Sequence, residues 1–479
     1  MGNSGVTRRL AEFLVRAKYE DLPSEVVHAA KMMILDTLGI GIAASVVNRE
    51  DVAPVVRVTE EWGGRKDCTL IGSGKKTSWF NAILVNGTFM HSLDYDDTRP
   101  GLVTHTGVVV VPAVLALGEK LKISGKEAIL ATVLGHETVF RVASSVMPTH
   151  YQFWHSTGTN GTFAAAAVAG KLNGLNADEM ERALGIAADQ ASGLISSVEG
   201  DLTKWLHAGL TSAKGALSAM LVKNGATAPR AILEYPRGYC NAYSRAPDLD
   251  KIVSDLGKSF DIVNNAPKYY PSILCSHCAI AATLKIVTEN NISADEVVKI
   301  EEKTYNVPVP KTAFENRKLE TTLQARLNHP YCIAVAILDR EVGMKQFEPQ
   351  RLQDKRIQDL MGKVSWEIDL QLEKLYQENS FDMRPVRVTI TTKGGRVFSA
   401  EEVFAKGFRK NPISPQEMER KFETLCSYAL EPARIKKLKD MIKQMDSLKS
   451  ISGLMRLTVE KRRSMPPNAG KDGMSKTII

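Results

Sequence analysis

The sequence lacks the features that mark membrane-spanning and secreted proteins. No uninterrupted apolar run reaches the roughly 18 residues that a transmembrane helix needs. Residues 1–9 contain no apolar signal core. The 6 cysteines are scattered along the chain, so they predict no disulfide framework. These absences favour a cytoplasmic protein that does not insert into a membrane.

Motifs for common nucleotide cofactors are also missing. Gly74 and Lys75 resemble the end of a phosphate-binding loop, but Thr69 stands where the first glycine of that loop belongs. No G-x-G-x-x-G follows a predicted strand, which argues against a dinucleotide-binding fold. No G-x-S-x-G marks the nucleophile elbow of a hydrolase.

Metal-binding patterns are incomplete. Cys275 and Cys278 have C-x-x-C spacing, but a structural zinc site needs four ligands and the chain has no second such pair. We therefore interpret both as ordinary buried thiols. The histidine and carboxylates that begin at His91 could hold a divalent ion, yet no H-E-x-x-H or comparable ligand set accompanies them. We predict no metal.

The charge balance does not indicate nucleic-acid binding. The net charge is +8, but much of the excess lies in residues 434–439 and 460–463. Aromatic residues make up only 6% and do not alternate with basic ones along a stripe. We expect no nucleic-acid partner, and a positive bias elsewhere suits anionic substrates.

What is present is a long, mostly helical pattern with one interruption. Residues 6–232 read as consecutive helices, with Ser78 and Asn176 as helix-starting residues. After residue 270 strand patterns appear at 297–307 and in a hairpin at 386–398, while 349–364 looks helical. Ser414 opens a further helical stretch.

These patterns predict a mainly α fold. A large all-helical domain is expected from residues 1–268 and 406–464 together, with a smaller α+β lid inserted at 269–405. The polar tail, 465–479, is expected to be disordered.

The densest group of reactive side chains lies between two helical patterns. Asp94, Asp96 and Asp97 follow His91 closely, and His105 comes eight residues after the last of them. Carboxylates and histidines this close shift each other's pKa, which acid–base chemistry requires. The sequence therefore predicts one wall of an active site here.

Other segments add polar groups of the same kind. His155 precedes a helix whose Gly158 and Gly161 either expose backbone amides to an anion or make a simple capping turn. Lys204 and His207 are three residues apart, on one helical face, where they either bind carboxylates or face solvent.

Several ordered blocks identify the chain as similar to the MmgE/PrpD family, which includes 2-methylcitrate dehydratases and cis-aconitate decarboxylases. The resemblance spans about residues 5–460. The blocks are LDTLG at 35–39, HSLDYDDT at 91–98, WH at 154–155 through GTFA at 161–164, ALGIA at 183–187, TKWLHAG at 203–209, KYYP at 268–271 with SH at 276–277, and PYCIA at 330–334.

The resemblance implies a homodimer without an organic cofactor, in which a cleft between the helical domain and the lid binds a small polycarboxylate. It also implies that matching residues line the site: Asp94, His105, His155, Lys204, Lys268, His277 and Tyr331. One departure is Thr106, where many members have proline after the histidine.

The residue types suggest how such a site would work. Lys204 and Lys268, with His207 beside them, would neutralise substrate carboxylates. His105 or His155 would move a proton next to a carboxylate, with Asp94 tuning a histidine. Tyr331 or His277 would assist loss of hydroxide. We expect a lyase that dehydrates a 2-methylcitrate-like acid. Decarboxylation of cis-aconitate to itaconate, epimerisation of an amino- or imino-dicarboxylate and a non-catalytic binding role are the alternatives.

Overall fold

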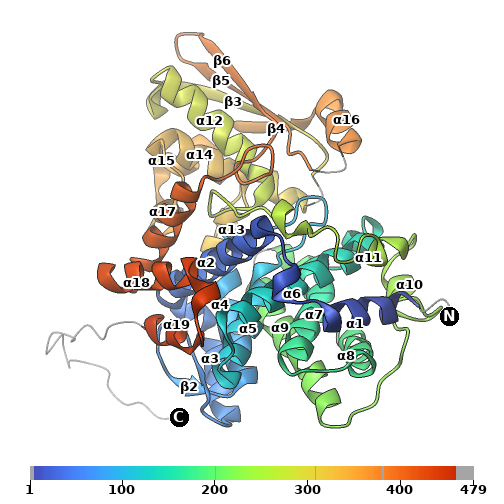
Figure 1. Ribbon diagram of the computed structural model, residues 1–479. Coiled ribbons are helices and arrows are strands. Elements are labelled where there is room, and N and C mark those ends of the chain that lie inside the picture. Colours follow the sequence, from blue (N-terminus) through green and yellow to red (C-terminus); the bar gives the residue numbers. More distant parts are fainter. Residues whose placement is uncertain (1–4, 200, 308, 380–381, 460–479) are drawn as a thin grey trace, which may run out of the picture.

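The computed structural model describes residues 5–199, 201–307, 309–379 and 382–459. The prediction for the tail at 465–479 lies outside these ranges. Within them, a large helical body carries a smaller lid that contains the main sheet (Figure 1). This confirms the predicted fold class, mainly α with an α+β lid.

The helical body begins with the first half of the chain. Its helices are α1 (Val6–Arg16), α2 (Ser24–Val47), α3 (Arg49–Trp62), α4 (Trp79–His91), α5 (Gly107–Leu121), α6 (Gly125–Val146), α7 (Ser156–Leu172), α8 (Ala177–Asp189), α9 (Leu202–Lys223), α10 (Tyr239–Tyr243) and α11 (Asp250–Val253). A small ladder pairs β1 (Cys68–Thr69) with β2 (Lys76–Thr77).

Helix starts follow the side chains that the sequence offers. Ser78 accepts a hydrogen bond from Asn81 N at 3.3 Å at the start of α4. The Asn176 side chain accepts one from Glu179 N at 3.0 Å, and the Glu179 carboxylate accepts one from the Asn176 backbone N–H. Such bonds satisfy amide groups that have no partner inside the helix. Both predicted helix starts are confirmed.

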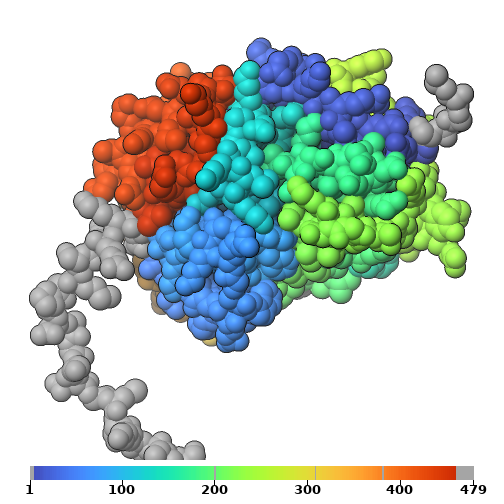
Figure 2. All heavy atoms as spheres, turned by 60° about the horizontal axis from the view of Figure 1, so that its bottom comes forward, coloured from blue at the N-terminus to red at the C-terminus, as the bar shows by residue number. Residues whose placement is uncertain are grey.

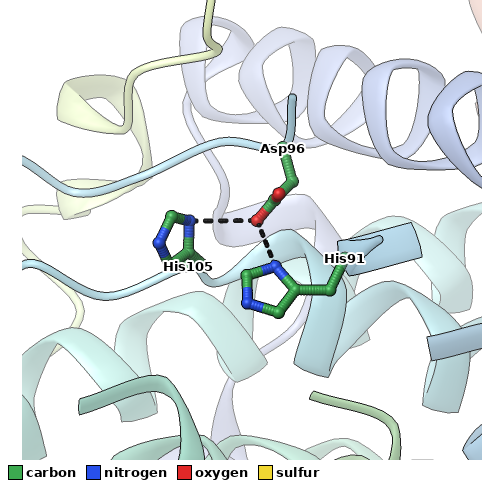
Figure 3. A group of neighbouring side chains, drawn as sticks. All are labelled: His91, Asp96 and His105. Carbon is green, nitrogen blue, oxygen red and sulfur yellow. Dashed lines mark hydrogen bonds and ion pairs between the residues drawn. The ribbon is translucent and has the colours of Figure 1, made fainter. Parts of the chain in front are cut away.

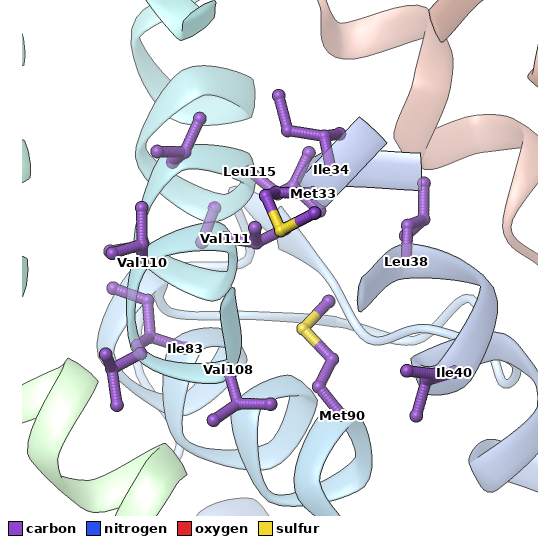
Figure 4. Packing of buried hydrophobic residues seen from close by; sticks show 14 of the residues in the cluster. Met33, Ile34, Leu38, Ile40, Ile83, Met90, Val108, Val110, Val111 and Leu115 are labelled. Atoms are coloured by element: carbon purple, nitrogen blue, oxygen red, sulfur yellow. The ribbon is translucent and has the colours of Figure 1, made fainter. Parts of the chain in front are cut away.

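The core forms where α2, α4 and α5 meet. Figure 4 shows apolar side chains from these helices directed toward one another: Met33, Ile34, Leu38, Ile40, Ile83, Met90, Val108, Val110, Val111 and Leu115. Among the described residues, α2 is long and apolar enough to span a membrane, but 78% of its most apolar stretch is buried inside the fold. A helix that is apolar on all sides fits the centre of a helical domain.

The helices around the site lie unusually close together. In α7, Ala164, Ala165, Ala166 and Ala167 are fully buried. A methyl group added at Gly215 of α9 would come within 2.2 Å of the Thr162 carbonyl oxygen of α7. Small residues therefore bring α7 and α9 together, and both helices carry site residues at their N-terminal ends.

The end of the chain returns to the helical body. Helices α17 (Pro415–Cys426), α18 (Pro432–Lys443) and α19 (Ser452–Leu457) pack against α2 and α5. Figure 2 shows this C-terminal segment, in red, lying against segments from the first third of the chain. Lys421 of α17 donates to the carbonyl oxygens of Tyr95 and Lys268 at 2.9 and 2.8 Å. The C-terminal part therefore helps to hold two site segments in place.

The lid has a core of its own around a four-stranded sheet. The strand order is β4 (Val364–Ile368), β3 (Val297–Thr304), β5 (Val386–Thr392), β6 (Val397–Glu402), with β3 and β4 parallel and the other pairs antiparallel. Its helices are α12 (His277–Glu289), α13 (Thr322–Arg326), α14 (His329–Asp339), α15 (Lys355–Met361) and α16 (Leu370–Glu378). The hairpin is confirmed, whereas the helix predicted over 349–364 shrinks to α15 and is followed by β4.

Candidate active site

A cavity lies between the helical body and the lid. The body contributes polar groups from the loop after α4, the start of α7 and the start of α9. The lid contributes groups from residues 273–275 and from the segments that follow β3 and precede β5. The lining residues are Asp94, Thr98, Val103, His105, Tyr151, His155, Val198, Lys204, Lys268, Ile273, Leu274, Cys275, Tyr305, Val307, Val309, Leu327 and Arg384. Five of the residues predicted from the sequence thus share one cavity.

Asp94 joins the two lysines of the cavity. Lys204 Nζ forms an ion pair with Asp94 Oδ1, and Lys268 Nζ lies 3.2 Å from Asp94 Oδ2 and 2.9 Å from the Asp94 carbonyl oxygen. Burial alone would raise the pKa of Asp94, but the two ammonium groups lower it below its ordinary value. One carboxylate therefore faces two cations, which leaves the cluster with a net positive charge for an anionic ligand.

The backbone around Asp94 is held in a conformation that few side chains adopt. Asp94 has φ 49° and Val103, at the far end of the same loop, has φ 46°. For a β-branched residue this left-handed conformation costs about 1–3 kcal/mol. Both residues line the cavity, so the surrounding structure maintains strain at the candidate site.

Asp96 connects two histidines (Figure 3). Its Oδ2 lies 3.0 Å from His91 Nδ1 and 3.0 Å from His105 Nδ1, and His105 Nδ1 is also 2.9 Å from the Asp97 carbonyl oxygen. Because His105 Nδ1 faces only acceptors, it carries the hydrogen, and Nε2 is the nitrogen left to exchange a proton with a ligand. Burial would raise the pKa of Asp96, but the two imidazoles hold it well below the ordinary value.

The same three side chains are the described residues that come closest to a metal site. The potential ligand atoms of His91, Asp96 and His105 all lie within 4.8 Å of one another. However, both imidazoles turn Nδ1 toward a single Asp96 oxygen, and hydrogen bonds explain this arrangement without an ion. Burial lowers the pKa of His91 to about 4, so its ring is neutral at pH 7.

Asp97 has a different role from its two neighbours. It accepts hydrogen bonds from the backbone N–H groups of Thr106 and Gly107 at 3.2 and 3.0 Å, where α5 begins. A methyl group at Gly107 would lie 2.3 Å from Asp97 Oδ1, so this contact requires glycine. The three clustered carboxylates thus separate into a partner for lysines, a partner for histidines and a helix cap.

His155 pairs with another histidine. Its Nδ1 lies 3.0 Å from His207 Nδ1, and His207 Nδ1 is 3.4 Å from Ser197 Oγ. Burial, followed by the nearby His207, lowers the pKa of His155 well below the ordinary value, so His155 is neutral and can accept a proton. Added methyl groups at Gly158 and Gly161 would meet Ser192 O at 2.7 Å and Val109 Cγ1 at 2.9 Å. These glycines serve close packing rather than ligand contact.

Three residues predicted for the site, His207, Tyr331 and His277, lie outside the cavity lining. The Tyr331 hydroxyl donates to the Gln346 carbonyl oxygen at 2.7 Å, and its ring borders a separate pocket near Lys318. His277 is fully buried, with Nε2 3.3 Å from the Ser272 carbonyl oxygen. Burial, followed by Lys268, lowers the pKa of His277 to about 3.

The lid supplies cavity residues that the sequence did not indicate. Arg384, two residues before β5, and Tyr305, just after β3, line the cavity from the lid, and Tyr151 lines it from the helical body. The Arg384 guanidinium also lies 5.6 Å from the Tyr376 ring centre. No local motif marks these residues, because their positions depend on how the lid sits over the body.

Comparisons with known proteins identify the family of the chain. Residues 8–252 match the MmgE/PrpD N-terminal domain and residues 270–447 match the MmgE/PrpD C-terminal domain. A cis-aconitate decarboxylase of Aspergillus terreus is 26% identical, covering 95% of this chain and 96% of its own. The cis-aconitate decarboxylase of Mus musculus is 26% identical, with 94% and 93% covered. A cis-aconitate decarboxylase-like protein of Aspergillus oryzae is 24% identical, with 94% and 97% covered.

The two domain matches together span most of the chain, and the relatives align over nearly their whole length. The cavity with its lysines and histidines lies between the parts that those two matches cover. The chain therefore belongs to the MmgE/PrpD family and is a lyase.

Proposed function

We propose that this lyase decarboxylates a small unsaturated tricarboxylate of the cis-aconitate type. The observation that carries the proposal is the cavity itself, where Lys204 and Lys268 share a single carboxylate, Asp94. A ligand with several carboxylates supplies the negative charge that this group of cations lacks. The named relatives act on such a compound.

The cations that line the cavity suit the electron flow of this reaction. The bond to one carboxylate breaks and carbon dioxide leaves. The released electron pair forms a new terminal double bond, and the carbon that loses the original double bond takes a proton. Lys204 and Lys268 from the body and Arg384 from the lid would hold the remaining carboxylates and stabilise the charge that develops.

His105 is the best-placed proton donor. Its Nδ1 is held by Asp96 and by the Asp97 carbonyl oxygen, so Nε2 is the exchanging nitrogen. The Asp96 carboxylate stabilises the positive charge that the ring carries while it moves a proton. The neutral His155 on the same wall would accept or relay protons between turnovers.

Dehydration of a 2-methylcitrate-like hydroxy acid is the second candidate, because the family includes such enzymes and the neutral His155 is a suitable base. It receives less support here. The two acids expected to assist hydroxide loss, Tyr331 and His277, lie outside the cavity lining, so Tyr151 or His105 would have to serve. Epimerisation and a purely binding role have no specific observation in their favour.

The proposal is tested by offering the purified protein cis-aconitate and 2-methylcitrate in parallel. We expect carbon dioxide and itaconate from cis-aconitate, and no new absorbance near 240 nm from 2-methylcitrate. His105→Gln should lose at least about 100-fold in kcat, whereas the control His28→Gln, at an exposed histidine, should keep wild-type activity. Faster turnover of 2-methylcitrate would favour the second candidate, and turnover of neither acid would refute both.

A further inference from the structure

A second group of reactive side chains lies on the lid side of the cavity, away from the lysines and histidines of the helical body. Cys275 lines the cavity in the short turn before α12. Its Sγ lies 3.3 Å from His329 Nε2, at the first residue of α14. The other ring nitrogen, His329 Nδ1, lies 2.8 Å from Glu302 Oε1 on β3.

This order of groups is that of an activated nucleophile. If Nδ1–H of His329 donates to the Glu302 carboxylate, Nε2 faces the thiol and can take its proton. Three separate elements of the lid bring these side chains together, and His329 and Glu302 are 0% and 1% exposed. Burial of a carboxylate and an imidazole costs free energy. A thiol that only fills space would not need these two groups beside it.

Charge supports the same interpretation. Burial would lower the pKa of His329, but Glu302 and Cys275 raise it to about 10. A ring with this pKa carries a proton at pH 7, so it can keep the proton that the thiol gives up. Arg384 and Lys268 line the same cavity, so an anion that enters it would be held near Cys275.

The other cysteines offer a direct comparison. Cys278 and Cys332 are fully buried and line no cavity near the site, and burial raises the pKa of both thiols, to about 12 for Cys332. Cys275 is 7% exposed and borders the cavity. Both Cys275 and Cys278 are buried thiols, as the sequence predicted, but Cys275 also borders the cavity.

We propose that Cys275, His329 and Glu302 form a nucleophilic thiol site that captures small electrophilic carboxylates covalently inside the cavity. Toward an α,β-unsaturated carboxylate, Sγ forms a bond to the β-carbon and the double-bond electron pair moves to the α-carbon. That carbon takes the proton that His329 removed from the thiol. No group leaves, nothing is oxidised, and a thioether results.

The site shares the cation-lined cavity with the proposed decarboxylation but needs no turnover, so it can be tested separately with iodoacetate. Here Sγ displaces iodide, which leaves with its electron pair, and the thiol proton passes through His329 to water. Peptide mass spectrometry would give the alkylation rate of each cysteine in the folded protein. We expect Cys275 to react at least about tenfold faster than the other five.

Two further measurements distinguish a thiol that the cavity activates from a thiol that reacts only because the reagent can reach it. The first readout is the ratio of the alkylation rate with iodoacetate to that with neutral iodoacetamide. This ratio should be about tenfold higher for Cys275 than for glutathione, the reference thiol, because the cavity cations attract the carboxylate. Citrate, which has no electrophilic carbon, should protect Cys275. Equal rates for all cysteines, or no preference for the anionic reagent, would overturn the proposal.

Glu302→Gln tests the relay. It should slow Cys275 alkylation about tenfold, while Glu301→Gln, which changes the neighbouring residue paired with Lys299, should leave the rate unchanged. An unchanged rate in a folded Glu302→Gln variant would contradict the relay. If that variant does not fold, the reagent preference and citrate protection in the wild-type protein still decide the proposal.

Discussion

His155 Nδ1 and His207 Nδ1 lie 3.0 Å apart, so only one of the two nitrogens can carry a hydrogen in this contact. Protonation of both rings would place two positive charges side by side, close to the Lys204 ammonium group. This pairing, together with burial, keeps His155 neutral. It also makes the protonation of His155 sensitive to a residue that does not line the cavity.

His207→Gln should therefore change the pH dependence of the reaction. Glutamine retains a hydrogen-bonding side chain but removes the neighbouring ring charge, so the pKa of His155 should rise. Because activity needs neutral His155, the acid limb of the kcat/KM profile should move to higher pH, by about 0.5–1 unit. A profile from pH 5 to 9 measures this. An unchanged acid limb, or one moved to lower pH, would show that His155 does not govern it.

Asp96→Asn should impair catalysis more than binding. The amide cannot stabilise positive charge on His105, and it can leave His105 in the wrong tautomer. We expect kcat to fall about 10²–10⁴-fold with KM nearly unchanged. Steady-state kinetics would show this, with Asp189→Asn at an exposed position as the control. A rise in KM at constant kcat would assign Asp96 to ligand binding instead.

Lys268→Met should weaken binding of the polycarboxylate as well as turnover. The variant removes a cation from the cavity and leaves Asp94 paired with Lys204 alone. We expect kcat/KM to fall at least about 100-fold, and calorimetry should show a similar loss of citrate affinity. Lys285→Met, at an exposed position on α12, is the matched control. Wild-type affinity for citrate in Lys268→Met would contradict this role.

The Asp94 cluster should also affect stability against acid. The pKa of Asp94 is lower in the folded state than its ordinary value, so the unfolded chain binds the proton first as pH falls. The stability that ionised Asp94 contributes is present above about pH 4 and is lost as pH decreases further. Urea unfolding at pH 3 to 7 should show this decline.

Asp94→Asn provides the comparison for that decline. It should lower the free energy of unfolding at pH 7 by about 3–5 kcal/mol, because two buried ammonium groups lose their counter-ion. It should also make stability less dependent on pH between 3 and 5. A variant with the same acid dependence as the wild type would exclude Asp94 as its source.

The fold class could be predicted from the sequence because it depends on local patterns. Ser78 and Asn176 cap helices through residues three positions away, and the hairpin at 386–398 has a turn that its glycines permit. Strand β4 was missed for a physical reason. Its residues alternate between apolar and polar, but the strand is only 5 residues long, lies at the edge of the sheet and is half-buried or exposed, so its signal is weak beside that of the preceding helix.

The candidate site could be predicted only where side chains lie in recognisable blocks. Asp94, His105, His155, Lys204 and Lys268 come together in one cavity, as the family resemblance implies. Tyr331 belongs to the same kind of block, yet α14 turns its hydroxyl toward Gln346. Arg384 enters the cavity because of how the lid is positioned, which no local pattern encodes.

The most direct test of the account is the reaction of cis-aconitate in D₂O, followed by proton NMR. Decarboxylation with protonation by a solvent-exchanging imidazole predicts itaconate with one deuterium on the carbon that gained the proton. The same protein with His105→Gln should produce almost none. Recovery of unchanged cis-aconitate from folded wild-type protein would contradict the central claim that this cavity decarboxylates a tricarboxylate.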